Sequence, residues 1–186
     1  EDAFAGDAGV FTVSVHEERR WPFSGQLSDN AGGTACNIPV PRGLRDSEFR
    51  LILDEIVMPL IARHAPEILV LQCGADGLAD DPLSRMELTN TAIWEAVAKE
   101  TRAVPRALVT GGGGYNPWSV ARCWSGVWEV LRALTWNRAG GRNPPDHWFD
   151  TMADAPSRNA VRREVRDLVA AAHILYVKSE DKELPR

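Results

Sequence analysis

The sequence has no long hydrophobic run. A transmembrane helix takes about 18 or more consecutive apolar residues, and no stretch of the chain approaches that length. The first residues also lack the basic start and the apolar core of a secretory signal peptide. We therefore expect a protein that does not bind a membrane and that works in the cytoplasm, or in the nucleus if its host is a eukaryote.

The sequence also lacks an excess of positive charge, with 21 Lys and Arg against 26 Asp and Glu. The formal net charge is -5 at pH 7, and the isoelectric point lies near 5.4. This balance argues against a broad electrostatic surface for nucleic acid. The phosphate-binding pattern Gly-x-x-x-x-Gly-Lys-Ser/Thr is also absent. We expect neither a direct nucleic-acid partner nor a nucleotide site.

Cysteine is rare. The three cysteines, Cys36, Cys73 and Cys123, are widely spaced and lie in apolar contexts. An odd number at such spacing indicates neither a disulfide framework nor a cysteine zinc knuckle. We expect buried, reduced thiols.

Strand-like and helix-like segments alternate along the chain. Hydrophobic residues make up 44% of the sequence, enough for a buried core. Short β-branched runs predict strands at residues 10–16, 36–40, 67–72 and 107–110. Apolar positions at helical spacing, such as Phe49, Ile52, Ile56, Leu60 and Ile61, predict a first helix that Asp46 or Ser47 caps. Further helices are predicted to begin at 87, at 117 and at 158. The first helix ends before Pro66, the others near 102, 136 and 177, and an irregular segment covers 139–156.

This order predicts an α/β fold of three αβα layers, with a mostly parallel sheet and helices on both faces. In such sheets ligands bind where the carboxyl ends of strands open into loops. Two unusual loops, one around Asp76 and one around Tyr115, follow predicted strands. The sequence therefore places a candidate site at that edge.

The loop of residues 74–83 is rich in Asp and Gly. A carboxylate such as Asp76, held just beyond a buried strand, is a suitable ligand for a hard or borderline cation. For this loop taken alone, an ordinary turn whose side chains cap nearby amides is the favoured interpretation.

The four glycines of residues 111–114 lie between a strand and a helix that Asn116 can cap. They let another molecule approach the backbone closely, and Tyr115 follows them directly. Its hydroxyl could donate a hydrogen bond to charge developing on a carbonyl oxygen. A plain tight turn is the alternative.

Taken together, the motifs resemble those of one family. The motifs are residues 71–76 (LQCGAD), 81–83 (DPL), 88–89 (LT), 111–116 (GGGGYN) and 121–124 (ARCW). In this order and spacing they closely resemble successive signatures of the histone deacetylase and acetoin-utilisation family. Residues 1–4, 13–16 and 36–39 also resemble the family, so the similarity covers most of residues 1–135. It thins from Trp136 onward, although residues 145–147 are still similar.

The resemblance implies an arginase/deacetylase-like fold and a zinc-dependent amidohydrolase that removes acetyl groups from lysines of proteins. It implies that Asp76 is one of three ligands of the catalytic zinc, or of ferrous iron in its place. Tyr115 matches the tyrosine that stabilises the tetrahedral oxyanion. Trp21, Leu83 and Gly113 match the walls and rim of the substrate tunnel, although Trp21 taken alone would be interpreted as a half-buried loop aromatic.

The resemblance also implies two potassium sites formed mainly by backbone carbonyl groups. Phe4, Asp7, Val10 and Thr34 match one of them, and Ser14 and Val15 match part of the other. His16 matches a family histidine in a supporting role. Where the family usually has Phe-Pro-Gly, this chain has Trp21-Pro22-Phe23, so the entrance of the tunnel is expected to be narrower or differently angled.

Several family elements are absent from the sequence. The Asp-x-His-His-Gly segment, the tandem general-base histidines and the substrate-clamping aspartate normally lie upstream of the equivalent of Glu1. We therefore expect residues 1–186 to be the C-terminal part of one deacetylase domain, with a motif-bearing region at 1–135 and a tail with a terminal helix at 136–186. Because a catalytic zinc takes three protein ligands, the chain should be inactive without the missing N-terminal half, and its exposed sheet edges should need that partner.

Three interpretations stay open. The chain belongs to a deacetylase of acetylated proteins or peptides, to an amidohydrolase of acetylpolyamines, or to a non-catalytic remnant that acts as a binding module. An upstream Asp-x-His-His segment separates the first two from the third. A comparison of peptide and small-amine substrates separates the first from the second.

Overall fold

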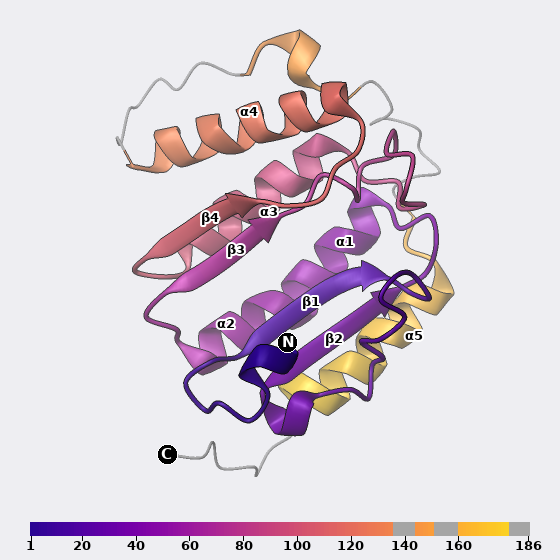
Figure 1. Cartoon of the computed structure of the whole chain (residues 1–186), viewed down its shortest axis with the longest axis vertical. Coiled ribbons are helices and arrows are strands. Elements are labelled where there is room, and N and C mark those ends of the chain that lie inside the picture. The colour runs from indigo at the N-terminus through magenta and orange to yellow at the C-terminus, as the bar shows by residue number, and fades with distance from the viewer. Residues whose placement is uncertain (136–143, 151–159, 179–186) are drawn as a thin grey trace.

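The strands of the protein are parallel and form two pairs. The computed structural model describes residues 1–135, 144–150 and 160–178. Strand β1 (Thr12–Glu17) pairs with β2 (Ala35–Val40), and β3 (Leu69–Cys73) pairs with β4 (Ala107–Gly111), both in parallel. Figure 1 shows the four arrows pointing the same way, in the order β4, β3, β1, β2 across the molecule. The predicted α/β class with parallel strands is confirmed, and among the described residues no ladder joins β3 to β1.

Helices alternate with the strands as expected. The elements are α1 (Asp46–Ile52), a π-helical turn η3 (Leu53–Val57) and α2 (Met58–His64) between β2 and β3, α3 (Asn90–Arg102) between β3 and β4, α4 (Pro117–Thr135), α5 (Arg163–Ala172) and a second π-helical turn η6 (His173–Val177). Short 3-10 turns are η1 (Asp2–Phe4), η2 (Ala31–Gly33) and η4 (Asp146–Trp148). Among the described residues no helix is long and apolar enough to cross a membrane.

Between α1 and α2 the chain forms one continuous helix through Pro59. A proline inside a helix has no N–H to donate and clashes with the carbonyl group four residues earlier. Here the preceding turn is widened, so that the Met58 N–H bonds to the Leu53 carbonyl oxygen five residues back. The wider turn lets the helix continue instead of ending at the proline.

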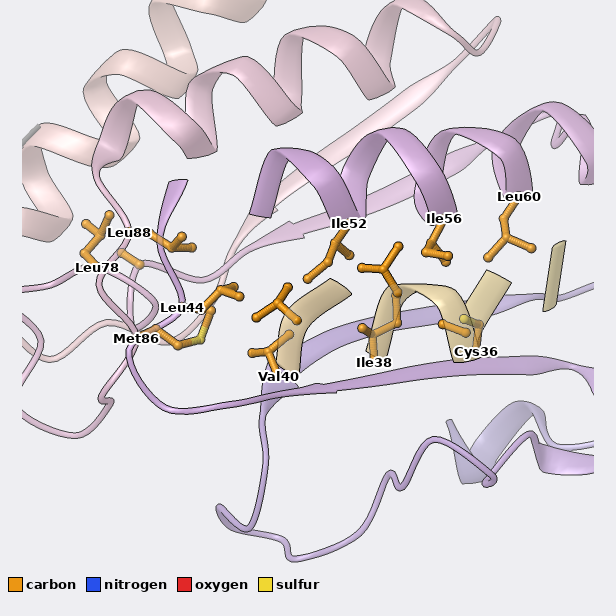
Figure 2. Close-up of a cluster of buried hydrophobic side chains, with 14 of the residues drawn as sticks. Cys36, Ile38, Val40, Leu44, Ile52, Ile56, Leu60, Leu78, Met86 and Leu88 are labelled. Atoms are coloured by element: carbon orange, nitrogen blue, oxygen red, sulfur yellow. The ribbon is translucent and has the colours of Figure 1, made fainter. Parts of the chain in front are cut away.

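The larger hydrophobic core lies between this long helix, β2 and α5 (Figure 2). Ile52, Ile56 and Leu60 follow one another at four-residue spacing and face the strand, and all three are buried. From β2, the alternate residues Ile38 and Val40 point into the same core. Each fully buried aliphatic side chain contributes about 2 kcal/mol, so this interface fixes the position of β2.

A second core holds α3 and α4 against β3 and β4. Its buried members are Cys73, Trp94, Val97 and Val127. The Trp94 indole N–H donates to the Cys123 carbonyl oxygen at 2.8 Å, which links the two helices. The prediction of buried, unpaired cysteines is confirmed, because all three are buried and free.

The opposite face of the β3–β4 pair is uncovered. Side chains that alternate with the core residues point away from α3 and α4, and Val70 and Leu108 are 64% and 56% exposed. On α4, Trp124 and Trp128 are also exposed, 37% and 64%. The described residues therefore give this strand pair helices on one face, where the sequence predicts helices on both.

Two helices begin later than the sequence predicts. The segment before α3 is extended, because the Glu87 and Leu88 N–H groups bond to the carbonyl oxygens of Leu44 and Gly77. The helix therefore begins at Asn90 and not at 87. Likewise α5 begins at Arg163 and not at 158, since the Arg162 N–H is held by the Glu48 carboxylate. Residues 158 and 159 lie outside the described residues.

The predicted cap of the long helix was wrong. Arg45 occupies the N-cap position, and Asp46 is the first helical residue. The Asp46 carboxylate instead accepts hydrogen bonds from the backbone N–H and the hydroxyl of Thr89, at 2.8 and 2.7 Å. The predicted last residue of α4, Trp136, and most of the irregular segment 139–156 lie outside the described residues.

Candidate functional site

The two unusual loops lie side by side at the carboxyl ends of β3 and β4. The strand register places Cys73 opposite Gly111 at the last ladder position. Beyond it, the Ala75 N–H donates to the Gly113 carbonyl oxygen at 2.6 Å, so the two loops stay paired after the strands end. The Trp124 indole N–H adds a bond to the Cys73 carbonyl oxygen at 3.0 Å. The predicted site residues Asp76, Gly113 and Tyr115 are thereby brought together.

The Asp76 carboxylate occupies space that only glycines leave open. A Cβ atom on Gly74 would lie 2.6 Å from Asp76 Oδ1, and one on Gly113 would lie 2.6 Å from Asp76 Oδ2. Contacts this short are not tolerated, so both positions require glycine while the carboxylate stays in place. Asp76 itself is half-buried.

Asp81 joins the two loops from the other side. Its side chain is 5% exposed. Oδ1 accepts from the backbone N–H groups of Leu83 and Ser84, at 2.8 and 3.3 Å, and Oδ2 accepts from the Tyr115 N–H at 2.8 Å. A buried carboxylate with three such donors is well satisfied without a cation.

Tyr115 projects from the end of the glycine stretch, and its side chain is 57% exposed. The next residue, Asn116, caps α4, as predicted: its Oδ1 accepts from the Trp118 N–H at 3.1 Å. Asn116 Nδ2 also donates to the Asp80 carbonyl oxygen at 3.2 Å. Hydrogen bonds on both sides therefore hold the backbone of Tyr115, while its exposed ring can contact a ligand.

The loop after β1 is attached to the loop that carries Leu83. Glu17 Oε2 accepts from Arg20 Nε and from the Arg85 N–H, each at 2.9 Å, and Arg20 also donates to the Leu83 carbonyl oxygen. Leu83 and Trp21 are 58% and 85% exposed, so the alternative of a half-buried Trp21 does not hold within the described residues. Phe23, in the same loop, is 73% exposed. These apolar side chains lie on two segments that Glu17 and Arg20 hold together.

His16 is held from both sides of its ring. Its Nε2 lies 2.9 Å from the Gly25 carbonyl oxygen, and its Nδ1 lies 2.9 Å from the Ser14 hydroxyl. Because a carbonyl oxygen only accepts, Nε2 donates to Gly25 in this arrangement. His16 is thus bonded within the protein and anchors the loop that contains Trp21.

Three of the four residues expected at the first potassium site, Phe4, Asp7 and Val10, lie in successive turns of one segment. Asp7 N–H bonds to the Phe4 carbonyl oxygen, and Val10 N–H bonds to the Asp7 carbonyl oxygen. The Thr34 hydroxyl accepts from the Gly6 N–H at 3.1 Å, which brings Thr34 to the same turn. The two residues expected at part of the second potassium site, Ser14 and Val15, lie in β1.

No complete metal site is formed by the part of the chain that the structure describes: it contains no group of three or more His, Cys, Asp or Glu side chains able to hold an ion. A catalytic zinc takes three protein ligands. Asp76 can serve as one carboxylate ligand, but the described residues do not supply the three ligands that a catalytic zinc takes.

The buried thiols are not nucleophiles. Burial raises the pKa of Cys73 to about 11 and the pKa of Cys123 to about 12. Burial likewise raises the pKa of Cys36 to about 12. The reactive form of cysteine is the thiolate, so chemistry that depends on a cysteine nucleophile is excluded at these positions near neutral pH.

Three residues with a role in the site's geometry were not singled out from the sequence: Glu17, Arg20 and Asp81. For Asp81 a signal existed, because an aspartate before Pro82 is typical of a turn in which the carboxylate caps the following amides. Its bond to Tyr115 spans 34 residues and leaves no mark in the local sequence. Arg20 and Glu17 each have a partner that is farther still, 63 and 68 positions along the chain.

Comparison with known proteins gives a consistent result. The family profile described as histone deacetylase domain matches residues 1–131. Histone deacetylase HOS1 of Saccharomyces cerevisiae is 36% identical over 149 residues, which cover 77% of this chain and 32% of the yeast protein. Histone deacetylase 8 of Xenopus laevis is 32% identical over 157 residues, covering 81% of this chain and 47% of the frog protein.

Solved structures agree. A crystal structure of a histone deacetylase homologue from Aquifex aeolicus superposes with a TM-score of 0.65 at 28% identity, over 88% of this chain and 50% of that one. A homologue complexed with SAHA superposes with a TM-score of 0.70, also at 28% identity, over 91% of this chain and 52% of that one. The chain thus spans about a third to a half of the length of the relatives it matches.

Proposed function

The chain belongs to the histone deacetylase family, and from that membership we propose that it forms the part of a zinc-dependent lysine deacetylase that carries Tyr115 and one metal ligand, Asp76. The substrate class is an acetylated lysine in a protein or peptide. The observation that carries the proposal is the joining of the two loops: Ala75 bonds to Gly113, and Asp81 bonds to Tyr115. These bonds hold a half-buried carboxylate and an exposed phenol at one edge of the strand pair.

In this proposal Tyr115 acts on the acetyl carbonyl group. As water adds to that group, negative charge develops on its oxygen, and a hydroxyl donor aimed at the oxygen lowers the barrier. A donor fixed in place before the reaction is worth more than one that must be oriented during it. Tyr115 meets this requirement through its backbone, which Asp81 and the helix cap at Asn116 hold on either side.

Zinc, or ferrous iron in its place, would polarise the carbonyl group and activate the water. Asp76 supplies one ligand, and we propose that the other ligands and the general-base histidines come from an upstream half of the domain, outside residues 1–186. The uncovered face of β3 and β4, with Val70 and Leu108 exposed, supports such a partner. Exposed apolar surface of this kind normally packs against another element.

The apolar side chains near the site suit the aliphatic stem of an acetylated lysine. Leu83 and Trp21 lie on two segments that Glu17 and Arg20 hold together, and Gly113 forms backbone beside Asp76. Flat aromatic and aliphatic walls bind a slim apolar chain well. The turn that contains Phe4, Asp7 and Val10, with Thr34 bonded to it, is proposed to hold one potassium ion through backbone oxygens. Ser14 and Val15 of β1 are proposed as part of a second potassium site.

The test uses the longest native polypeptide that contains residues 1–186, supplied with zinc and an acetyl-lysine peptide, with acetate release as the readout. Tyr115→Phe and Asp76→Ala should each lower turnover by at least about 100-fold, but only Asp76→Ala should also lose bound zinc. Asp80→Asn is the matched control, an exposed acid in the same loop that should keep both.

Other outcomes redirect the proposal. Faster turnover of an acetylated polyamine than of the peptide would replace the lysine deacetylase by an acetylpolyamine amidohydrolase. No turnover of either substrate, in a polypeptide that binds no zinc, would leave a non-catalytic binding module.

A further inference from the structure

Asp81 has an unusual place in the site, because its charge is buried and its hydrogen-bond partners are backbone amides. The side chain is 5% exposed. The neighbouring Asp80 differs, because Arg122 of α4 pairs with it at 3.7 Å and with Asp150 at 2.9 Å. Hydrogen bonds from N–H groups to an ionised carboxylate are short and roughly twice as strong as neutral ones. Asp81 therefore holds its amide partners firmly.

The two carboxylate oxygens of Asp81 have different tasks. Oδ1 accepts from the N–H groups of Leu83 and Ser84, two and three residues later, which is the pattern of a local turn. Oδ2 accepts from the Tyr115 N–H, 34 residues away. The local turn needs only the first set of bonds. The second bond connects that turn to the end of the glycine stretch and serves no local purpose.

The bond to Tyr115 is the second of two hydrogen bonds that join the loops carrying the candidate catalytic groups. Asp76 lies between the two cross-loop bonds, Ala75 to Gly113 and Asp81 to Tyr115, on a loop whose ends are both attached to the glycine stretch. The distance from the Asp76 carboxylate to the start of the Tyr115 side chain is thereby set by two bonds and not by one flexible turn. The same Asp81 carboxylate also orients Leu83.

We propose that Asp81 is the positioning residue that fixes Tyr115, and with it Leu83, relative to Asp76. This inference rests on the proposed function, since it assigns Asp81 a role in the reaction of Tyr115. Asp81 does not touch the substrate. It acts through the backbone of Tyr115, so that the phenol meets the acetyl oxygen without a search for the right orientation.

The experiment compares Asp81→Asn with Asp80→Asn in the longest native polypeptide that contains residues 1–186. An asparagine keeps the size of the side chain but has only one accepting oxygen, so it cannot serve both the local turn and Tyr115. We expect Asp81→Asn to lower kcat for an acetyl-lysine peptide by about 10- to 100-fold, with KM changed much less, because a small misplacement of a catalytic group costs that much. Asp80→Asn should match the wild type.

A double-mutant cycle separates positioning from mere structural support. If Asp81 acts through the Tyr115 hydroxyl, then Asp81→Asn should cause little further loss in a Tyr115→Phe background, because the group it positions is already gone. Losses that multiply in the double variant, or a rise in KM with kcat unchanged, would overturn the proposal. So would an Asp81→Asn protein as active as Asp80→Asn.

A second readout does not depend on catalysis. Amide hydrogen exchange at Tyr115 should be slow in the wild type, where Asp81 holds the N–H, and markedly faster in Asp81→Asn, with exchange in the core of α3 unchanged. Equal protection of Tyr115 in both proteins would overturn the inference. If the wild type has no deacetylase activity, the proposed function fails, and exchange at Tyr115 still decides whether Asp81 positions it.

Discussion

The Asp76 carboxylate fills the space that a side chain on Gly113 would occupy. A methyl group on Gly113 would lie 2.6 Å from Asp76 Oδ2 and 2.7 Å from its carboxyl carbon. The glycine stretch therefore does more than form a turn. It leaves room for the carboxylate in a defined position at the end of β3, against the backbone that leads to Tyr115.

Gly113→Ala should displace the Asp76 carboxylate. We expect the variant to fold, to bind zinc at least about tenfold more weakly and to lose activity accordingly, since altered ligand placement commonly costs 10- to 100-fold. Zinc titration of the longest native polypeptide measures this directly. Gly77→Ala is the control, because its methyl group would meet Leu88 and Met86 at 3.4 and 3.5 Å, an ordinary contact. Equal zinc affinity of the two variants would contradict Asp76 as a ligand.

Glu100 should make the stability of the protein depend on pH. Burial raises the pKa of this carboxyl from 4.5 to about 7. The folded state then binds the proton more tightly than the unfolded chain, so the free energy of unfolding falls as pH rises from about 4.5 to 7 and levels off above. The full effect is about 3 kcal/mol at roughly 1.4 kcal/mol per unit.

Glu100→Gln removes this penalty. Thermal unfolding should show the variant more stable than the wild type at pH 8 and nearly equal to it at pH 4. Glu95→Gln on the same helix, whose side chain is 47% exposed and pairs with Arg50, should show no such pH-dependent gain. A Glu100→Gln protein that tracks the wild type at both pH values would show that the carboxyl is ionised at little cost.

Arg162 should be a major support of the last helix. Burial alone would raise the pKa of Glu48, but the hydrogen bonds from Arg162 and Arg45 together outweigh it and hold that pKa below its ordinary value. Arg162→Met leaves the fully buried Glu48 carboxylate without its cation, and we expect a loss of about 3 kcal/mol or more at pH 7. Denaturant titration measures the loss.

The pH dependence and the neighbouring arginine provide the checks on Arg162. Because its pKa is lowered, the Glu48 carboxylate contributes stability at pH values above its ordinary pKa, and this stability is lost as pH falls through the lowered pKa. The cost of Arg162→Met should therefore shrink near pH 3. Arg163→Met, at a side chain that is 95% exposed, should change stability by less than about 0.5 kcal/mol. A cost equal in the two variants would rule out the buried pair as a support.

Gly126 is a point of contact between α3 and α4. A Cβ atom there would lie 1.9 Å from the Trp94 ring. Gly126→Ala should therefore destabilise the protein by about 1 to 3 kcal/mol, or prevent folding, as overpacking does. In a Trp94→Phe background, where the ring is smaller, the same substitution should cost less, and calorimetry of the four proteins tests that. Additive losses would contradict the contact.

How far the sequence predicts the fold depends on how local each signal is. The four strands and the long helix follow from β-branched runs and from apolar spacing such as Ile52, Ile56 and Leu60, which one segment displays on its own. The helix starts were less accurate. Arg163 begins α5 because Arg162 is bound by Glu48, 114 residues away, and no local pattern contains that information.

The candidate site shows the same division. Asp76 and Tyr115 could be identified because they sit in motifs of several adjacent residues. Asp81 was in view only as part of a motif, and its bond to Tyr115 depends on how two strands pair. The exposure of Trp21 likewise depends on the packing of a whole loop, which its neighbours Arg20 and Pro22 do not reveal.

The exposed tryptophans make the intrinsic fluorescence of the protein sensitive to what covers them. Trp21, Trp118 and Trp128 are 85%, 77% and 64% exposed, whereas Trp94 is 5% exposed. Indoles in water emit at longer wavelengths than indoles in an apolar core, so the native emission should be red-shifted and easily quenched by acrylamide. Any chain that covers α4 or the loop that contains Trp21 would shift this fluorescence to shorter wavelengths. The spectrum could therefore follow such assembly in real time, without a label.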